Sequence, residues 1–432
     1  MRKYLLAMTA ACAYTGAWAE ISFENIDQAA AEVQPQVVEW RRWFHQNPEL
    51  SNREFNTSAR VAQILEEMGL EPLTGIAHTG VVAMIEGGKP GPLVAIRADM
   101  DGLPVTEQTG LPFASRARTE YNGQETGVMH ACGHDAHMAM ALGAAKVLNE
   151  MKDELAGSVM LIFQPSEEGA PVGEKGGAKL MLEEGLFSEQ VPEAVFGIHI
   201  GLGAPPGEFT TKPGPLMASA DRWSMKVIGR QTHGARPWGG VDPIVVSSQI
   251  IMAFQTIASR QLDVTKAPSI ISVGRIQGGI RNNVIPDFVE MEGTIRAFDP
   301  AMRSYIHEAM ERTARSIAES AMARVEFQVD PRGTPAVIND PALTERMYPV
   351  VQRVSGETPM LRMQPQTVAE DFSRYGEVTP SMFVFLGTLP EGVDPANAPS
   401  NHSPFFDINE DDLEQGVRLF GQLVVEYLQS EY

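Results

Sequence analysis

Short apolar segments alternate with amphipathic segments from about residue 36 to residue 210. The segments VVAMI, PLVAIRAD, SVMLIFQP and AVFGIHI have the length and composition of buried strands, whereas VVEWRRWFHQ and TSARVAQILEEM repeat apolar residues at helical spacing. This alternation predicts a mixed, largely parallel sheet covered by helices. Ligands of such sheets bind beyond the carboxyl ends of the strands, so polar residues at those ends are the first candidates for a site.

A different order of elements occupies residues 218 to 330. Four strand-like segments, DRWSMKVIG, SIISVGRI, DFVEMEGTIRAF and RVEFQV, are interleaved with two long helical segments in the split β-α-β-β-α-β order of a ferredoxin-like sandwich. Pro and Gly flank this region in TKPGPL and DPRGTP. We therefore predict an α/β protein whose main domain, residues 20–216 and 333–432, contains an inserted ferredoxin-like α+β domain, residues 217–332.

Metal-binding side chains are concentrated in the segment MHACGHDAHM, residues 129–138. Imidazole, thiolate and carboxylate groups at this density predict a metal site. Further candidates stand where three of the predicted strands end, which is where the fold would bring them together. The segment contributes His130, Cys132, His134, Asp135 and His137, and the strand ends contribute Asp99, Asp101, Glu167, Glu168 and His199.

Composition excludes several classes of partner. The 432 residues are 43% hydrophobic, which is enough to bury a sizeable core. A formal net charge of −21 leaves no basic surface for a nucleic acid backbone or an anionic membrane. No internal apolar run reaches the length of about 18 residues that a membrane span requires. We therefore expect a small-molecule substrate, no nucleic acid partner and no membrane association of the mature protein.

The first 19 residues have the features of a signal peptide. Arg2 and Lys3 precede a largely apolar run, and Ala17-Trp18-Ala19 forms an A-x-A cleavage pattern. We predict a bacterial protein that is exported to the periplasm or secreted. Cleavage would remove Cys12 and leave Cys132 as the single cysteine, with no intramolecular disulfide open to it. Coordination as a thiolate would protect such a thiol in an oxidising compartment.

Seven motifs then carry a family resemblance along nearly all of the mature chain: MHACGHDAHM, FQPSEEG, HGARPWGGVDP, RNNVIPD, GTIRAFD, AEDF and NHSPFFDINE. In this order they resemble the co-catalytic metallopeptidase family of aminoacylases and bacterial carboxypeptidases. Within it they are most similar to the amidohydrolase branch of hippurate hydrolases and auxin-conjugate hydrolases. The resemblance implies a two-domain protein whose inserted domain is a lid and a dimerisation surface, and we expect a homodimer or a higher homo-oligomer.

The same resemblance implies a ligand set for two divalent cations, Zn²⁺ or Mn²⁺, with Co²⁺ also possible. Cys132 occupies the position that bridges the two metals, where a thiolate can share its charge between two cations. Of the adjacent glutamates, the metal would hold Glu168 and leave Glu167 free as general base and later general acid. The implied ligands are Cys132, His134, Glu168, His199 and His402.

Asp101 is expected to orient one of the metal ligands by a hydrogen bond without binding the metal itself. Asp99, Asp135, His130 and His137 could do the same, or could cap or pin the helix that begins near Gly133.

The predicted lid supplies candidate substrate-binding residues. By resemblance, His233 and Asn283 contact the substrate carbonyl, the His often from the partner subunit, and Arg296 binds the free carboxylate, to which its planar fork is suited. The chain departs from the usual pattern at Gly234, where Ala is common, and at Asn282, which doubles the Asn. The second departure leaves open which Asn faces the substrate, and the position directly before Val284-Ile285-Pro286 favours Asn283.

These residues predict a metal-dependent amide hydrolase of N-acyl-L-amino acids or dipeptides. A hydroxide held between two metals would attack the amide carbonyl with Glu167 as general base and acid. One alternative is a thiol hydrolase that uses Cys132 with His134, which leaves Glu168, His199 and His402 without a role. The other is an exported binding protein with a structural metal, although structural zinc sites are usually closed by four protein ligands.

Overall fold

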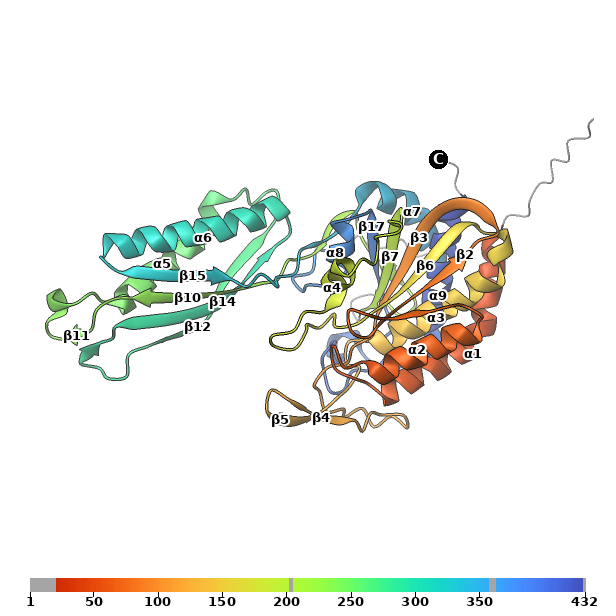
Figure 1. Cartoon of the computed structure of the whole chain (residues 1–432), viewed down its shortest axis with the longest axis horizontal. Coiled ribbons are helices and arrows are strands. Elements are labelled where there is room, and N and C mark those ends of the chain that lie inside the picture. Colours follow the sequence, from red (N-terminus) through yellow and green to blue (C-terminus); the bar gives the residue numbers. More distant parts are fainter. Residues whose placement is uncertain (1–20, 202–204, 357–362, 430–432) are drawn as a thin grey trace, which may run out of the picture.

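The computed structural model describes residues 21–201, 205–356 and 363–429. The predicted signal peptide, residues 1–19, lies outside the described residues. Two parts of unequal size lie side by side along the long axis, each with its own sheet (Figure 1). No helix in the described ranges is long and apolar enough to cross a membrane.

The larger part is built on a seven-stranded mixed sheet with the strand order β1-β2-β6-β3-β7-β17-β8. Its four central strands, β6, β3, β7 and β17, are mutually parallel neighbours, and antiparallel strands complete both edges. The strands are β1 (Leu73–Ile76), β2 (Gly80–Glu86), β3 (Lys89–Asp99), β6 (Ala156–Gln164), β7 (Ala194–Ile200), β8 (Phe209–Thr210) and β17 (Ser381–Leu386). The predicted mixed, largely parallel sheet is confirmed.

Helices cover both faces of this sheet and form two hydrophobic cores. Helix α3 is buried along almost its whole length, since it is apolar nearly all round and packs between the sheet, α1 and α9. The helices on this face are α1 (Phe23–Gln46), α2 (Phe55–Glu67), α3 (His134–Glu150), α7 (Pro341–Val354) and α9 (Leu413–Gln429), and α4 (Gly177–Glu183) and α8 (Ser373–Gly376) lie on the other face.

The smaller part has a four-stranded antiparallel sheet with the order β12-β14-β10-β15. Helices α5 and α6 pack on one face of it and close a separate core. Its elements follow one another as β10 (Asp221–Ile228), α5 (Pro243–Thr256), β12 (Ser269–Gly278), β14 (Phe288–Ala297), α6 (Pro300–Ser320) and β15 (Arg324–Val329). This is the predicted ferredoxin-like order. The limits at 217 and 332 stay a prediction.

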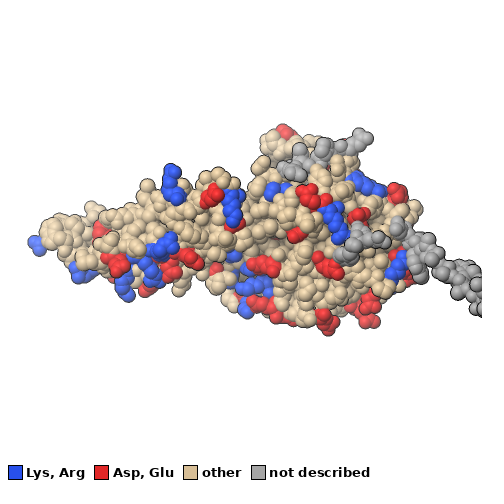
Figure 2. All heavy atoms as spheres, turned by 90° about the horizontal axis from the view of Figure 1, so that it is seen from above, with Lys and Arg blue, Asp and Glu red and all other residues tan. Residues whose placement is uncertain are grey.

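Short elements complete both parts. A π-helical turn, Ile257–Gln261, follows α5, and 3-10 turns lie at Lys152–Glu154, Pro237–Gly239, Pro395–Asn397 and Glu410–Asp412. The remaining strands form three pairs: β4 (Arg118–Tyr121) with β5 (Gln124–Gly127), β9 (Gly214–Met217) with β16 (Val337–Asn339), and β11 (Thr232–His233) with β13 (Val284–Ile285). On the face shown in Figure 2, Lys and Arg are interspersed with Asp and Glu.

Candidate metal centre

Three parallel strands bring their carboxyl ends to one edge of the large sheet, and the amino end of α3 meets them there. Asp99 ends β3, and Glu167 and Glu168 follow β6. His199 is the last residue but one of β7. Gly133 precedes α3 with a left-handed φ of 95°, and this turn places His134 at the first helical position. Segments far apart in the sequence therefore converge at one site.

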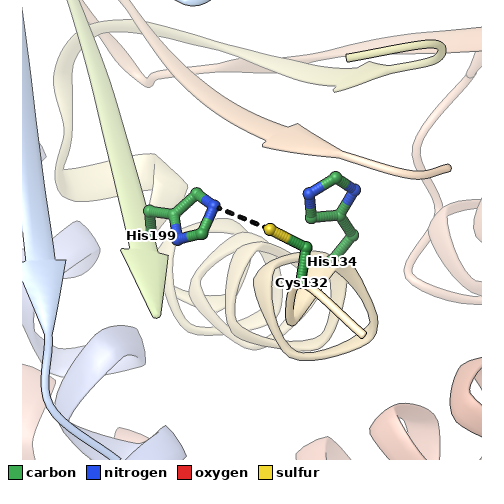
Figure 3. A group of neighbouring side chains, drawn as sticks. All are labelled: Cys132, His134 and His199. Atoms are coloured by element: carbon green, nitrogen blue, oxygen red, sulfur yellow. Dashed lines mark hydrogen bonds between the residues drawn. The ribbon is translucent and has the colours of Figure 1, made fainter. Parts of the chain in front are cut away.

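Cys132, His134 and His199 form the buried part of this site. Their ligand atoms all lie within 4.8 Å of one another. Figure 3 shows the Cys132 sulfur between the two imidazole rings, with Sγ 3.5 Å from His199 Nε2. His199 Nδ1 lies 2.7 Å from the carbonyl oxygen of Ile200. Because a carbonyl only accepts, Nδ1 carries the proton and Nε2 presents its lone pair toward Cys132, the arrangement found in metal-binding histidines.

Cys132 also belongs to a second group, with Glu168 and His402, whose ligand atoms again lie within 4.8 Å. His402 Nε2 lies 3.1 Å from Glu168 Oε1, and the backbone N–H of His402 donates to the Ala131 carbonyl at 2.7 Å. His402 has a left-handed φ of 70°, a conformation that is costly for a non-glycine residue and is concentrated at functional sites. The structure thus brings all five predicted ligands together, with Cys132 common to both groups.

The donor set fits two divalent cations. His134 is completely buried, yet neither of its ring nitrogens makes a hydrogen bond. The nearest carboxylate oxygens, from Asp101 and Asp99, are 3.4 Å and 3.8 Å away. Buried imidazole nitrogens without a partner are rare and costly unless an ion satisfies them. Thiolate, imidazole and carboxylate are ligands that zinc accepts, and imidazole and carboxylate also suit manganese and cobalt.

The surroundings of Cys132 do not favour a free thiolate. Burial raises the pKa of the Cys132 thiol, and the negative charge of Glu168 raises it further, while His134 and His402 act in the opposite direction. A thiol nucleophile needs a lowered pKa, whereas a bound cation would deprotonate a coordinating thiol outright. The geometry therefore supports the bridging ligand rather than the cysteine nucleophile.

Asp101 is a buried support for the turn that carries the two glutamates. Its Oδ1 accepts from the backbone N–H of Glu167 and its Oδ2 from that of Glu168, both at 3.0 Å. The Ser51 hydroxyl donates to Oδ2 at 2.6 Å. Asp101 Oδ1 lies 3.4 Å from His134 Nδ1, and its orienting role stays a prediction. The sequence did not indicate that Asp101 fixes the backbone of both glutamates.

Glu167 lies beside the ligands, but it belongs to neither of the two groups that contain Cys132. Its carboxylate shares one group with His134 and Glu168 and another with Glu370 and Asp371. Burial raises the pKa of Glu167 well above its usual value, and the charges of Glu370, Glu168 and Asp371 add to this effect. A carboxyl group that retains a proton more readily than usual suits a side chain that accepts and then returns one.

The other polar residues of the 129–138 segment lie beside the ligand groups and make contacts of their own. His137 forms a group with Asp99 and His134 whose ligand atoms lie within 4.8 Å of one another. His137 Nδ1 donates to Asp99 Oδ1 at 2.6 Å, and its Nε2 accepts from the Ile200 N–H at 2.8 Å, so both nitrogens are engaged. Asp135 binds Arg41 and His45, each at 2.8 Å. These contacts pin α3 to β7 and α1. His130 is buried with no hydrogen-bond partner, and burial lowers its pKa to about 4.

The predicted lid residues lie away from this cluster. His233 and Asn283 are both exposed, at the β11 end of the smaller part (Figure 1). They lie near each other, because the N–H of Gly234, which follows His233, donates to the Asn283 carbonyl at 2.8 Å. Arg296, on β14, donates to the carbonyl oxygens of Thr367 at 3.2 Å and Ile295 at 3.0 Å. Within the described ranges, no hydrogen bond or ion pair joins these three side chains to the five ligands.

Arg97, Glu370 and Asp371 are neighbours of the site to which the sequence analysis assigned no role. All three meet in one buried network behind Glu167. Arg97 interrupts an otherwise apolar strand, and a charged residue in such a strand signals a buried partner. That interruption and the AEDF motif, which contains Glu370 and Asp371, were the signs of the network in the sequence.

Comparisons with known proteins agree with this geometry. The model of peptidase family M20/M25/M40 matches residues 95–426. The chain is 39% identical over 407 residues to thermostable carboxypeptidase 2 of Saccharolobus solfataricus, covering 94% of this chain and 98% of that protein. It is 35% identical over 404 residues to the IAA-amino acid hydrolase ILR1-like 2 of Arabidopsis thaliana, covering 92% of this chain and 87% of that protein.

Among solved structures, the fold is similar to that of the YxeP protein of Bacillus subtilis, described as a dinuclear metal binding peptidase. The TM-score is 0.77 at 35% identity, with 93% of this chain and 99% of the other covered. The resemblance seen in the seven motifs is therefore confirmed.

Proposed function

The chain belongs to peptidase family M20/M25/M40, and from this premise we propose that it hydrolyses the linear amide bond of N-acyl-L-amino acids or dipeptides. One observation carries the proposal: two groups of metal-competent side chains share Cys132, with Glu167 directly beside them. A structural metal site has no need for a shared ligand or for an adjacent carboxyl group with a raised pKa.

Five side chains hold the two cations, with Cys132 in the shared position. The hydrogen bond from His199 Nδ1 to the Ile200 carbonyl supports this assignment, because it orients the other ring nitrogen of His199 toward Cys132. Two divalent cations, when bound, lower the pKa of water and polarise the amide carbonyl. The set of donors is compatible with Zn²⁺, Mn²⁺ and Co²⁺.

Glu167 performs the proton transfers. Its carboxylate accepts a proton from the attacking water as the new C–O bond forms, and then donates that proton to the nitrogen of the amine as the C–N bond breaks. Asp101 keeps the Glu167 and Glu168 backbones in place through its two 3.0 Å hydrogen bonds. The adjacent glutamates therefore have different roles, because Glu168 binds metal and Glu167 remains free to transfer protons.

The free carboxylate of the substrate is the feature recognised on the amine side of the bond. Two relatives support this, because the names carboxypeptidase and IAA-amino acid hydrolase both describe substrates that end in an amino acid. Arg296 supplies the planar fork that a carboxylate accepts in two parallel hydrogen bonds. In this structure its donors rest on backbone carbonyls, from which a substrate could recruit them.

A homodimer completes the site. His233 and Asn283 stand at the far end of the smaller part, and a second copy could bring them to the metal groups (Figure 1). The same part carries exposed apolar side chains on α5 and on β12, which is an edge strand of its sheet. Open edges with apolar neighbours are suited to pairing with another chain. These side chains are Ile244, Val245, Met252, Ile270 and Ile276.

Export to the periplasm or beyond the cell rests on residues 1–19 and on the single remaining cysteine. A mature protein recovered from that fraction should begin at Glu20 when its N-terminus is sequenced. Recovery of the chain only inside the cell, still beginning at Met1, would exclude the signal.

A substrate panel tests the proposed function. Purified protein loaded with zinc or manganese should hydrolyse members of a panel of N-acetyl amino acids, N-benzoyl amino acids and dipeptides. A chelator should abolish the hydrolysis and added metal should restore it. Hydrolysis that survives complete removal of metal, or a folded, metal-loaded protein that cleaves none of the panel, would contradict the proposal.

A further inference from the structure

Arg97 lies completely buried on β3, behind the metal centre, and all of its donor groups are engaged. Its Nε donates to Gln164 Oε1 at 2.9 Å and its Nη1 to Asp99 Oδ2 at 2.7 Å. Its Nη2 donates to Glu370 Oε1 at 2.9 Å and to Asp371 Oδ1 at 3.1 Å. One guanidinium therefore holds three carboxylates from two distant segments of the chain.

The Glu370-Asp371 side of this network faces Glu167. The carboxylate oxygens of Glu167, Glu370 and Asp371 all lie within 4.8 Å of one another. Three carboxyl groups this close repel each other when ionised, so a compensating charge must hold them together. Arg97 provides it, while Gln164 Nε2 at 2.6 Å and the Ala178 N–H at 2.8 Å fix the two oxygens of Asp371.

Additional bonds make this arrangement rigid. The Phe372 N–H donates to Glu370 Oε1 at 2.8 Å, and the Tyr375 hydroxyl donates to Gln164 Oε1 at 3.0 Å. Burial raises the pKa of Glu370, whereas the ion pair with Arg97 at 2.9 Å favours its charged form. None of the described residues makes a hydrogen bond or an ion pair with the Glu167 side chain, so its surroundings determine where its carboxylate can lie.

We propose that Arg97 is a positioning residue for the general base: it anchors Glu370 and Asp371 as a fixed wall beside Glu167 and so sets the place of the Glu167 carboxylate relative to the metal ligands. Arg97 touches none of the five ligands through a hydrogen bond or ion pair that the described residues make. The inference rests on the proposed function, because it assigns a support to the base of that reaction.

Lysine cannot replace Arg97 in this role. Its ammonium keeps the charge but lacks the planar fork that reaches Asp99 and the Glu370-Asp371 pair together. In Arg97→Lys the side chains of Glu370 and Asp371 should be held less firmly, and the Glu167 carboxylate should move from its position beside the metal ligands. A displacement of about 1 Å in a catalytic group can cost on the order of a hundredfold in rate.

A double-mutant cycle with Glu167→Gln tests the proposal. Arg97→Lys should lower kcat by roughly ten- to a hundredfold in the parent protein, with KM and the content of two metals per chain unchanged. In the Glu167→Gln background the same substitution should change the residual kcat by less than about twofold, because its only route of action is already removed. Competition with a chromogenic chelator should give the same zinc affinity for parent and Arg97→Lys.

Arg41→Lys is the matched control. Arg41 is as buried as Arg97 and also binds several carboxylates, including Asp135 and Glu410. Within the described part of the chain it makes no hydrogen bond or ion pair with Glu167. Whatever factor Arg41→Lys imposes on kcat should be the same in both backgrounds. If Arg97→Lys behaved likewise, its role would be structural and the proposal overturned. Loss of metal from Arg97→Lys would overturn it too, since the effect would then pass through Asp99 to the ligands.

Glu370→Gln decides the question if Arg97→Lys does not fold. The amide keeps an oxygen for Arg97 and the Phe372 N–H but removes the charge beside Glu167. The effect of Glu370→Gln on kcat should also disappear in the Glu167→Gln background. An equal fold-change in kcat in both backgrounds would contradict the proposed positioning of Glu167. A failure of the proposed function is recognised separately, because Glu167→Gln alone would then leave metal-dependent turnover intact.

Discussion

His199 directs its Nε2 toward the Cys132 sulfur at 3.5 Å while its Nδ1 donates to the Ile200 carbonyl at 2.7 Å. The backbone contact fixes both the tautomer and the ring orientation of His199. Cys132 is therefore faced by a lone pair rather than by an N–H that could stabilise a thiolate. This arrangement suits two ligands of one cation, and the pKa of the Cys132 thiol, which burial and the charge of Glu168 raise, does not favour a thiolate nucleophile.

Replacement of Cys132 separates these two roles. Cys132→Asp should keep measurable activity, since a carboxylate can also span two metals, although it is a harder ligand and should alter the metal preference. Cys132→Ala should lose metal and activity together. Metal analysis alongside turnover measures both effects.

A thiol nucleophile predicts the opposite pattern. It forms an acyl-enzyme that aspartate at this position could not reproduce in the same way. If folded Cys132→Asp retained both metals but showed no turnover, and alkylation of the metal-loaded parent trapped an inactive adduct without releasing metal, the bridging assignment would be wrong.

Substitution of the adjacent glutamates should have unequal effects. Glu167→Gln should bind metal normally and lose at least about a hundredfold in kcat, because general base catalysis contributes roughly 10²–10⁴. Glu168→Gln should weaken metal binding itself, since Glu168 lies in one ligand group with Cys132 and His402. Metal titrations and single-substrate kinetics on the two variants provide the comparison, and equal metal loss in both would refute the division of labour.

Arg296 should discriminate between a free carboxylate and its amide. A substrate whose C-terminal carboxylate is amidated should be cleaved far more slowly by the parent, because the guanidinium of Arg296 is then left without its charged partner. Arg296→Ala should reduce this discrimination mainly by slowing the free acid. The ratio of kcat/KM for the two substrates is the measurement, and a ratio near one in the parent excludes carboxylate recognition by Arg296.

Inactive variants should complement each other if the partner subunit supplies His233. Glu167→Gln and His233→Ala should each be strongly impaired, yet a refolded equimolar mixture should regain roughly a quarter of the parent activity, because half of the dimers are mixed and one of their two sites is intact. A control mixture of Glu167→Gln with Glu168→Gln should regain nothing. A monomer in sedimentation that is fully active, or a mixture no more active than its components, excludes the shared site.

Part of the candidate site could be predicted because it obeys a rule of parallel sheets, whereas Cys132, His134 and His402 were assigned as ligands by the family resemblance. Asp99, Glu168 and His199 come from different strands, but the carboxyl ends of parallel neighbours meet at one edge, so their convergence follows from the strand pattern alone. The second strand pattern likewise predicted the ferredoxin-like order. Local periodicity is a sufficient signal for both.

The surroundings of Glu167 could not be predicted in this way. Glu370 lies on a loop, and its partner Arg97 is 273 residues away in the sequence, so no local pattern joins them. Nor does any local pattern fix the placement of His233 relative to the metals, because that depends on how two separately packed parts meet and on a second copy. The roles of Asp135 and His137 were open for a similar reason, until their contacts with α1 and β7 showed them pinning α3.

Titration of the metal-free protein with Zn²⁺, Mn²⁺ or Co²⁺, with bound metal and turnover followed in the same samples, tests the central claim most directly. The five ligands around Cys132 predict that metal binds up to two equivalents per chain and that full activity requires the second. Fully active protein that contains fewer than about one metal per chain would contradict the two-metal centre.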